Sequence, residues 1–270
     1  MDRTQIVIPC YNEAERLDVE RFQRFSKSHP RFRFLFVNDG STDATASLID
    51  GLQAASPHSM AAFHLGQNQG KAEAVRQGLL LSLATDATAV GYWDADLSTP
   101  LDALTQFQDV LERRPDIQLV MGTRLPLMGR SIERRWIRQK LGRIFGRCAS
   151  YVVGLPIYDT QCGAKLLRAG NATRSLFAER FTSRWIFDVE MLVRWRVACR
   201  IMGSADPHAH LYELPLERWL EVKGSRLKST DFIRAIGELW SIRRKYASQL
   251  YGDLPIGNAE SDDSALERAA

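Results

Sequence analysis

Five short apolar runs, separated by polar turns and by stretches with helical spacing, constrain the fold of the first 125 residues. The runs are residues 5–9, 32–37, 60–65, 89–93 and 117–122, and the intervening helices are expected to begin near residues 12, 44, 71 and 99. Strands that alternate with helices of this length predict a parallel sheet with right-handed crossovers. The sequence therefore predicts an α/β fold of Rossmann type, whose ligands bind at the carboxyl ends of the strands.

The second half of the chain breaks this alternation. We expect a basic amphipathic helix over 131–153, an extended piece over 160–167, helices over 172–177 and 187–200, a strand over 211–214 and a last amphipathic helix over 230–250. The end of the chain is acidic and rich in small residues, which is typical of disorder. Since 270 residues bury one substantial core, the prediction is one domain over 1–228, a C-terminal amphipathic helix over 229–251 and a disordered tail over 252–270.

Composition narrows the class of protein. No run approaches the roughly 20 apolar residues that span a bilayer, and the first residues lack the pattern of a signal peptide. The four cysteines form no C-x-x-C pair, which fits reduced thiols in a cytoplasmic protein. A net charge of +4 is too small to argue for nucleic-acid binding. We therefore expect a cytoplasmic protein without a nucleic-acid partner.

Two carboxylates, Asp94 and Asp96, stand one residue apart where the fourth apolar run ends. Side chains so placed on a chain leaving its strand can converge on one hard cation. Mg²⁺ and Mn²⁺ prefer such oxygen ligands, often shared with phosphates. The alternative is an acidic turn that caps the next helix. The first interpretation predicts a divalent metal site for a nucleoside diphosphate.

Two common nucleotide motifs are excluded. Residues 66–71 are one residue short of a P-loop, and Ala72 stands where the P-loop needs Ser or Thr. No G-x-G-x-x-G follows the first strand. The turn there instead contains Tyr11 and Glu13, an aromatic face and a carboxylate suited to a base and a ribose.

Four motifs in order carry a family resemblance: VIPCYNE at 7–13, NDGSTD at 38–43, NQGK at 68–71 and DAD at 94–96. Together they resemble the family 2 inverting glycosyltransferases, which have the GT-A fold, a Rossmann-like mixed sheet flanked by helices. Segments at 159–166, 184–190 and 224–227 resemble the dolichyl- and polyprenyl-phosphate sugar synthases of that family, above all the dolichyl-phosphate β-glucosyltransferases. The resemblance covers residues 5–228.

The resemblance implies roles for residues at matching positions. Those around the nucleotide are Pro9, Tyr11, Glu13, Asp39, Lys71 and Asp94, and the ligands of Mg²⁺ or Mn²⁺ are Asp94 and Asp96. The chain departs from the family pattern at three places: Asn38 replaces the first acid of a double acid, Ser98 a frequent glutamine and Ala164 a common phenylalanine.

A basic segment between residues 124 and 147 suggests an anionic acceptor. It contains eight cations against the single acid Glu133: Arg124, Arg130, Arg134, Arg135, Arg138, Lys140, Arg143 and Arg147. A lipid phosphate is already an anion near pH 7, so it needs positioning rather than a general base. Arg124 and Arg138 best match the family's phosphate-holding arginines, and Asp159 and Arg226 complete the predicted acceptor site. A hydroxyl acceptor would instead require a carboxylate base, for which Asp188 is the candidate and Asp159 the second choice.

The amphipathic helices suggest a membrane surface as partner. Apolar residues recur at helical spacing in the basic helix over 131–153, and the last helix places Phe232, Ile236, Leu239 and Trp240 beside Arg243, Arg244 and Lys245. Such faces are usually core, but cationic helices with aromatic residues also lie in lipid headgroup layers. We expect peripheral attachment to the cytoplasmic membrane face.

The predicted function is inverting transfer of a hexose from a nucleotide-sugar donor, of UDP-glucose or GDP-mannose type, to a polyprenyl phosphate acceptor. Arg124 and Asp188 join the two metal-binding acids as the predicted catalytic residues. A first alternative is transfer to a soluble or glycan hydroxyl. A second is a non-catalytic module that binds anionic membranes or RNA through the basic segment.

Overall fold

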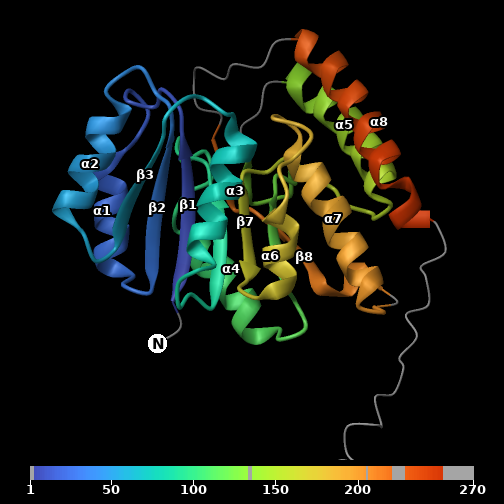
Figure 1. The fold of residues 1–270 in the computed structure, drawn as a ribbon, viewed down its shortest axis with the longest axis horizontal. Coiled ribbons are helices and arrows are strands. Elements are labelled where there is room, and N and C mark those ends of the chain that lie inside the picture. The colour runs from blue at the N-terminus through green and yellow to red at the C-terminus, as the bar shows by residue number, and fades with distance from the viewer. Residues whose placement is uncertain (1–2, 133–135, 205, 221–228, 252–270) are drawn as a thin grey trace, which may run out of the picture.

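A mixed sheet with helices on both faces organises the molecule (Figure 1). The computed structural model describes residues 3–132, 136–204, 206–220 and 229–251, without the side chains of 136–143 and 229–233. Seven strands of the described chain form the main sheet: β1 (Thr4–Cys10), β2 (Phe32–Asp39), β3 (Met60–Leu65), β4 (Ala89–Trp93), β5 (Leu119–Thr123), β7 (Ala164–Arg168) and β8 (Leu211–Pro215). Their order is β3-β2-β1-β4-β7-β5-β8. The predicted α/β fold with a mixed sheet is confirmed.

Strand direction divides the sheet. The strands β3, β2, β1 and β4 run parallel, as the alternation predicts. Between β4 and β5 lies β7, which is antiparallel to both neighbours, while β8 runs parallel to β5. Because β7 runs backwards, its first residue lies at the same edge of the sheet as the last residue of β4.

The helices form two layers. Buried residues of α1 (Val19–Ser28), α2 (Thr45–Ala55) and α4 (Ala103–Arg113) pack on one face, in the same cluster as Ile6 and Ile8 of β1. The other face, with Val7 of β1, packs against α3 (Lys71–Ser82), α6 (Asn171–Ala178) and α7 (Phe187–Ile201). Alternate residues of a strand face opposite sides, so β1 is apolar on both.

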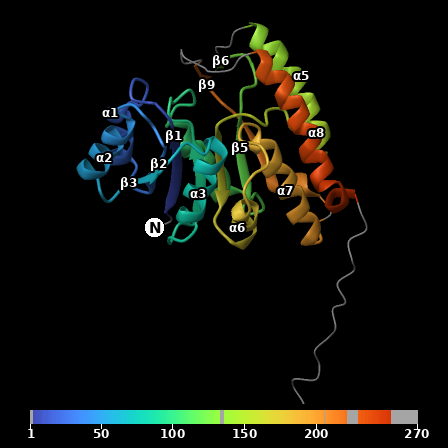
Figure 2. The same ribbon diagram turned by 45° about the horizontal axis from the view of Figure 1, so that its top comes forward.

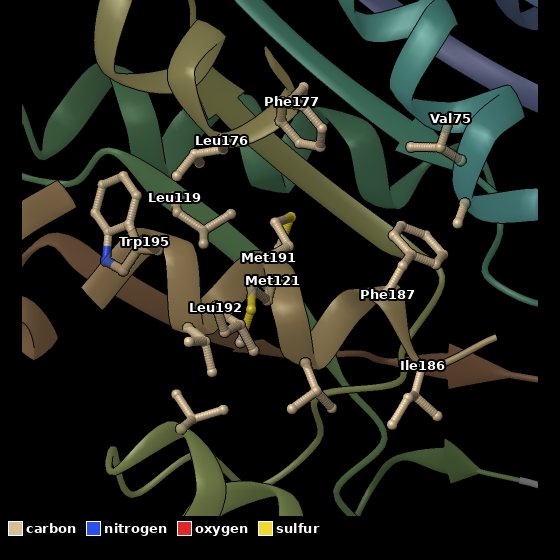
Figure 3. Packing of buried hydrophobic residues seen from close by; sticks show 14 of the residues in the cluster. Val75, Leu119, Met121, Leu176, Phe177, Ile186, Phe187, Met191, Leu192 and Trp195 are labelled. Carbon is tan, nitrogen blue, oxygen red and sulfur yellow. The ribbon is translucent and has the colours of Figure 1, made fainter. Parts of the chain in front are cut away.

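Helix α7 is the centre of the second layer. Eleven of its fifteen residues are buried, among them the charged Asp188, Glu190 and Arg194. Met191, Leu192 and Trp195 lie among Leu119 and Met121 of β5 and Leu176 and Phe177 of α6 (Figure 3). The first turn of α7 carries two buried acids, Asp188 and Glu190.

The last helix, α8 (Ser229–Tyr251), packs beside α5 (Trp136–Val153) and against α7 (Figures 1 and 2). It adds Leu239, Ile242, Tyr246 and Leu250 to the same core cluster. The fully buried Glu190 of α7 accepts hydrogen bonds from Tyr246 Oη at 2.9 Å and from Lys245 Nζ at 3.2 Å. The predicted C-terminal amphipathic helix is therefore joined to the domain by apolar and charged contacts.

Three predicted helix starts were wrong. Residues 12–15 and 99–102 form turns, and α1 begins at Val19 after the capping carboxylate of Asp18, while α4 begins at Ala103. The third wrong start is that of α5, which was predicted at residue 131 and is observed at Trp136. Ser131–Ile132 forms instead a short strand, β6, paired with β9 (Arg218–Trp219). In the first case the Asn12 side chain accepts a hydrogen bond from the loop after β2 instead of capping a helix. The tail 252–270 lies outside the described residues.

Candidate active site

The site lies where four strand ends meet. The chain leaves β1, β2 and β4 at one edge of the sheet, and β7 begins there because it is antiparallel. Trp93 is paired with Ala164, so Gly163 lies beside Asp94, whose N–H donates to the Gly163 carbonyl at 3.1 Å. Residues far apart in sequence thus share one edge.

The predicted metal ligands lie on a tight turn after β4. Asp94 is 34% exposed, and Asp96 accepts a hydrogen bond from the Ser98 N–H at 3.0 Å. Leu97, in the same turn, has a φ of +50°, a left-handed conformation that costs a non-glycine residue on the order of 1 kcal/mol. Such strain is common at functional sites, and here it falls beside Asp96.

Gly163 makes room for the Asp94 carboxylate. A Cβ at position 163 would lie 1.9 Å from Asp94 Oδ2 and 2.2 Å from its Cγ. A side chain at position 163 would therefore displace the Asp94 carboxylate. The carboxylate of Asp94 is consequently held against the backbone of the segment that leads into β7.

Lys71, the first residue of α3, points its ammonium group at the same carboxylate. Its Nζ lies 2.5 Å from Asp94 Oδ1. Burial lowers the pKa of Lys71, but the nearby charges of Asp94 and Asp188 outweigh burial and raise it. Lys71 is therefore protonated at neutral pH and stands beside the carboxylate predicted to hold a metal.

The loop after β1 is clamped to the loop after β2. Asn12 accepts a hydrogen bond from the Thr42 N–H at 2.8 Å, and its own N–H donates to Ser41 Oγ at 3.0 Å. The Glu13 N–H donates to Thr45 Oγ1 at 2.7 Å. Tyr11 and Glu13 are partly exposed on this loop, and Pro9 is partly exposed near the end of β1. The structure therefore brings together the predicted nucleoside residues that follow β1 and the loop that follows β2.

Asp39 is more deeply buried than a base-binding residue needs to be. It is 2% exposed, and its carboxylate accepts hydrogen bonds from the backbone N–H groups of Gln69 and Gly70 at 2.7 and 2.8 Å and from Asn68 Nδ2 at 3.1 Å. Burial raises the pKa of Asp39, against the lowering effect of these bonds. This geometry favours Asp39 as the residue that shapes the loop at 66–70.

Arg184, from the second half of the chain, contacts the loop at 66–70. Arg184 donates from Nη2 to Asn68 Oδ1 at 2.8 Å and packs over Gly70, whose φ is +96°. A Cβ at position 70 would lie 2.8 Å from Arg184 Nε. The glycine is therefore needed both for its backbone conformation and for this close approach.

Arg124 and Asp159 form a bidentate ion pair at the end of β5. Arg124 donates from Nε and Nη2 to the two Asp159 oxygens at 2.6 and 2.7 Å, and its backbone N–H donates to Oδ2 at 3.1 Å. The guanidinium also lies 5.2 Å from the ring centroid of Trp219. Asp159 is in turn placed by Glu213, which accepts from the N–H of Tyr158 and of Asp159.

A cavity of about 760 Å³ opens beside this pair. Its apolar wall comes from the second half of α5 and from the loop that follows it, with Phe145, Leu155 and Ile157 buried. Arg124 and Arg147 supply positive charge. Thr160 and Gln161 also line the cavity, and their Oγ1 and Nε2 atoms are buried away from solvent without a hydrogen-bond partner among the described residues. Such atoms call for a polar ligand or water.

Asp188, the predicted alternative base, lies deep in a charged network. It is 4% exposed, and Oδ1 accepts hydrogen bonds from Lys165 Nζ at 2.6 Å and from the Tyr92 hydroxyl. The structure places Asp188 underneath the edge where Asp94 lies.

Comparison with known proteins decides the family. The family model described as glycosyl transferase family 2 matches residues 5–168. The chain belongs to glycosyltransferase family 2. It is 29% identical over 274 aligned positions to a dolichyl-phosphate β-glucosyltransferase of Trichomonas vaginalis, covering 95% of this chain and 77% of that protein. It is 30% identical to the Saccharomyces cerevisiae enzyme of the same description, covering 92% and 76%.

A solved structure supports the fold of this glycosyltransferase. Glucosyl-3-phosphoglycerate synthase from Mycobacterium tuberculosis, in complex with Mn²⁺ and UDP-glucose, matches with a TM-score of 0.56 and 18% identity, covering 92% of this chain and 78% of that one. The predicted GT-A architecture is confirmed by this match. None of the described helices combines the length and apolar character that crossing a bilayer requires.

Two predicted acceptor-site residues of the glycosyltransferase have side chains outside the described part of the structure. Arg226 falls in the undescribed stretch 221–228, and Arg138 lies on α5 where side chains are not described. Both stay predictions for the acceptor site.

Sequence reasoning missed three groups that hold the site together: Lys165, Arg184 and Glu213. Lys165 had a detectable signal, a charge between apolar residues near the start of β7. Glu213 likewise interrupts the apolar pattern of β8. Arg184 left no comparable signal, because its contact with Asn68 depends on how two distant loops pack.

Proposed function

We propose that this glycosyltransferase moves a hexose, with inversion, from a UDP- or GDP-sugar to a polyprenyl phosphate. The observation that carries the acceptor class is the cavity beside Arg124, which combines an apolar wall with fixed positive charge. The names of the curated relatives, dolichyl-phosphate glucosyltransferases, support the same acceptor.

On the donor side, the residues present suit a divalent ion shared with a diphosphate. Among the described residues, no three His, Cys, Asp or Glu side chains form a metal cluster of their own. Two carboxylates on one turn fit Mg²⁺ or Mn²⁺ when phosphate oxygens and water supply the other ligands. Asp94 and Asp96 would hold the ion, and the ion would stabilise negative charge on the leaving diphosphate. Lys71 adds a second positive charge there.

On the acceptor side, Arg124 binds and orients the phosphate. Asp159 occupies Nε and Nη2, and in the described part of the chain Nη1 makes no hydrogen bond. The pair therefore fixes the plane of the guanidinium and leaves one nitrogen for an anion in the cavity.

The chemistry follows from these positions. An acceptor phosphate oxygen attacks the anomeric carbon of the sugar, and the bond from that carbon to the diphosphate oxygen breaks. The electron pair leaves with the nucleoside diphosphate, whose charge Lys71 helps to balance. Because the nucleophile is already an anion, no side chain has to remove a proton, which agrees with the ion-paired state of Asp188.

The exposed faces of α5 and α8 are the proposed membrane surface. Ile144, Tyr151 and Trp240 are 51%, 63% and 60% exposed, and Arg243 lies over the ring of Tyr151. Leu239, in contrast, is a core residue. Aromatic and basic groups together suit the headgroup layer. Trp240→Glu should weaken binding to anionic vesicles, whereas Leu81→Glu, at an exposed position on α3, should not.

An extraction assay tests the function directly. The protein is incubated with Mn²⁺, labelled UDP-glucose or GDP-mannose, and polyprenyl phosphate, and the products are partitioned into organic solvent. We expect lipid-linked label with one donor and none when polyprenol, which lacks the phosphate, replaces the acceptor.

A hydroxyl acceptor, the alternative, predicts that the label stays in the aqueous phase. If the acceptor is a soluble or glycan hydroxyl, label moves from the nucleotide sugar to an aqueous product and the organic phase stays empty. That result would overturn the proposed acceptor and retain the donor site. The non-catalytic module is no longer an alternative, because the chain is a family 2 enzyme.

A further inference from the structure

Residues 159–163 connect the two sides of the site, and we call them the bridge segment. At its first residue, Asp159 holds Arg124 beside the acceptor cavity. At its last residue, Gly163 contacts the carboxylate of Asp94. Only three residues separate these contacts. Any change in the course of the bridge segment therefore alters the distance between the proposed metal ligand and the proposed acceptor ligand.

The middle of the bridge segment is held by a buried lysine. Lys165 is fully buried, and its Nζ donates to the carbonyl oxygens of Thr160 at 3.1 Å and Cys162 at 2.7 Å. A third bond, at 2.6 Å, goes to Asp188 Oδ1. All three protons of the ammonium group thus have acceptors. Lys165 ties two carbonyls of the bridge segment to the start of α7.

A purely apolar core would not need a buried ion pair such as that of Lys165 and Asp188. Burying an ammonium group is costly unless it is paired and hydrogen-bonded, and replacing a buried ion pair by apolar residues is often neutral or stabilising. Tyr92 completes the network by donating to Asp188 from the strand that ends at Asp94. The network therefore joins β4, the bridge segment and α7 directly below the site.

We propose that Lys165 and Asp188 are positioning residues for the transfer reaction, whose buried ion pair fixes the course of the bridge segment. Lys165 acts through the carbonyls of Thr160 and Cys162, and Asp188 acts through Lys165. The pair sets the spacing between Asp94 and Arg124. The inference rests on the proposed function, because it assigns those two residues to the donor and acceptor sides.

The test uses Lys165→Met, which keeps an unbranched side chain one atom shorter and removes all three hydrogen bonds. Nucleotide affinity is measured by calorimetry with and without Mn²⁺, using the base that the extraction assay selects, and the acceptor KM is measured by transfer. Without Mn²⁺ the affinity should equal that of the wild type, because the loops at 11–13 and 66–70 are untouched. The gain in affinity that Mn²⁺ brings should fall about 10- to 100-fold, as for other residues that support metal ligands. The acceptor KM should rise at the same time.

Arg168→Met is the matched control. Arg168 is the last residue of β7, and its guanidinium donates to the carbonyls of Ile117, Leu111 and Arg114 at the opposite end of the strand. The variant removes a cation that binds three carbonyls far from the bridge segment. It should lower the melting temperature and leave both the Mn²⁺ effect and the acceptor KM at wild-type values.

A second variant keeps the test decisive if Lys165→Met does not fold. Asp188→Asn retains the shape of the side chain, and it should reproduce the weakened Mn²⁺ effect and raised acceptor KM with an unchanged pH profile of kcat. Loss of a limb of that profile would identify Asp188 as a base and overturn the inference. The inference would also be overturned if Lys165→Met lowered the melting temperature but left the Mn²⁺ effect and the acceptor KM at wild-type values. Wild-type protein without Mn²⁺-dependent binding or transfer would instead overturn the proposed function.

Discussion

Replacing Gly163 by alanine is the most direct test of the geometry around Asp94. The new Cβ would lie 1.9 Å from Asp94 Oδ2, whereas ordinary contacts begin at 3.4 Å, so one group must move by about 1.5 Å. The backbone of Gly163 is held by its carbonyl, which accepts the Asp94 N–H, and by the strand pairing of Ala164 with Trp93. The carboxylate is therefore the group that moves.

A displacement of this size has a predictable effect on rate. Misplacing a catalytic group by about 1 Å costs on the order of a hundredfold in rate, so Gly163→Ala should lower kcat by about that factor. The Mn²⁺ concentration needed for half-maximal activity should rise, because Asp94 is the proposed metal ligand. Initial rates over a Mn²⁺ series measure both effects, and circular dichroism melting reports the fold.

Gly170→Ala is the control for this substitution. Gly170 lies just beyond β7, and a Cβ there meets no atom within 4 Å. Its kcat and Mn²⁺ dependence should match the wild type. If Gly163→Ala also kept wild-type kcat and Mn²⁺ dependence, the position of the Asp94 carboxylate would be irrelevant to the reaction, and the assignment of Asp94 would fail.

Three other predictions concern single side chains. Asp96→Asn should abolish Mn²⁺-dependent transfer and leave the melting temperature unchanged; retained turnover would remove Asp96 from the metal site. Arg124→Lys cannot keep the bidentate pair with Asp159, so the acceptor KM should rise about tenfold or more while the donor KM stays constant, and an equal rise in both would argue against an acceptor role. Glu190→Gln should reduce the fall in melting temperature that the wild type shows between pH 7 and pH 3. Burial raises the pKa of Glu190, but Arg194 and other partners lower it overall. The carboxylate therefore stabilises the wild type above pH 4.5, and this stabilisation is lost as the pH falls through the lowered pKa. If the melting temperature of the variant fell with pH as much as that of the wild type, the buried pair would not be the source of this pH dependence.

The apolar strands were predictable because their signal is local. Residues 32–37, 60–65 and 89–93 lie within or match β2, β3 and β4, since short, mostly apolar runs bounded by polar turns have the length of strands rather than of helices. The position of β7 between β4 and β5 was not predictable in this way. Strand order depends on which edges remain open after the helices pack, and no local pattern records that.

The wrong helix start at Asn12 has a physical cause. Asn12 resembles a helix cap in the sequence, but its side chain accepts a hydrogen bond from Thr42 instead. Short polar side chains serve caps and loop-to-loop contacts equally well, and only the folded chain decides between them. At Thr99 the backbone carbonyl accepts the indole N–H of Trp93 at 2.7 Å, which ties this turn to β4.

The candidate site shows the same contrast between local and long-range signals. Asp94 and Asp96 directly follow the end of β4, as the sequence predicts, and their role as metal ligands stays a prediction. The structure directs the Asp39 carboxylate to the backbone of Gln69 and Gly70, and its role at the nucleoside stays a prediction. The partners of Asp188 and Asp159 could not be predicted, because Lys165 and Arg124 come from other elements of the fold.

The direction of β7 explains how one edge of the sheet serves both substrates. A parallel strand at this place would begin at the opposite edge, and the residues before it would lie far from Asp94. Because β7 is antiparallel, the chain enters it at the active edge, and Asp159 and Gly163 fall between the ends of β4 and β5. The parallel half of the sheet then supplies the proposed donor loops, and the reversed strand brings the proposed acceptor ligands to the same edge. Lys165, one residue into β7, is placed where an anchor acts on both.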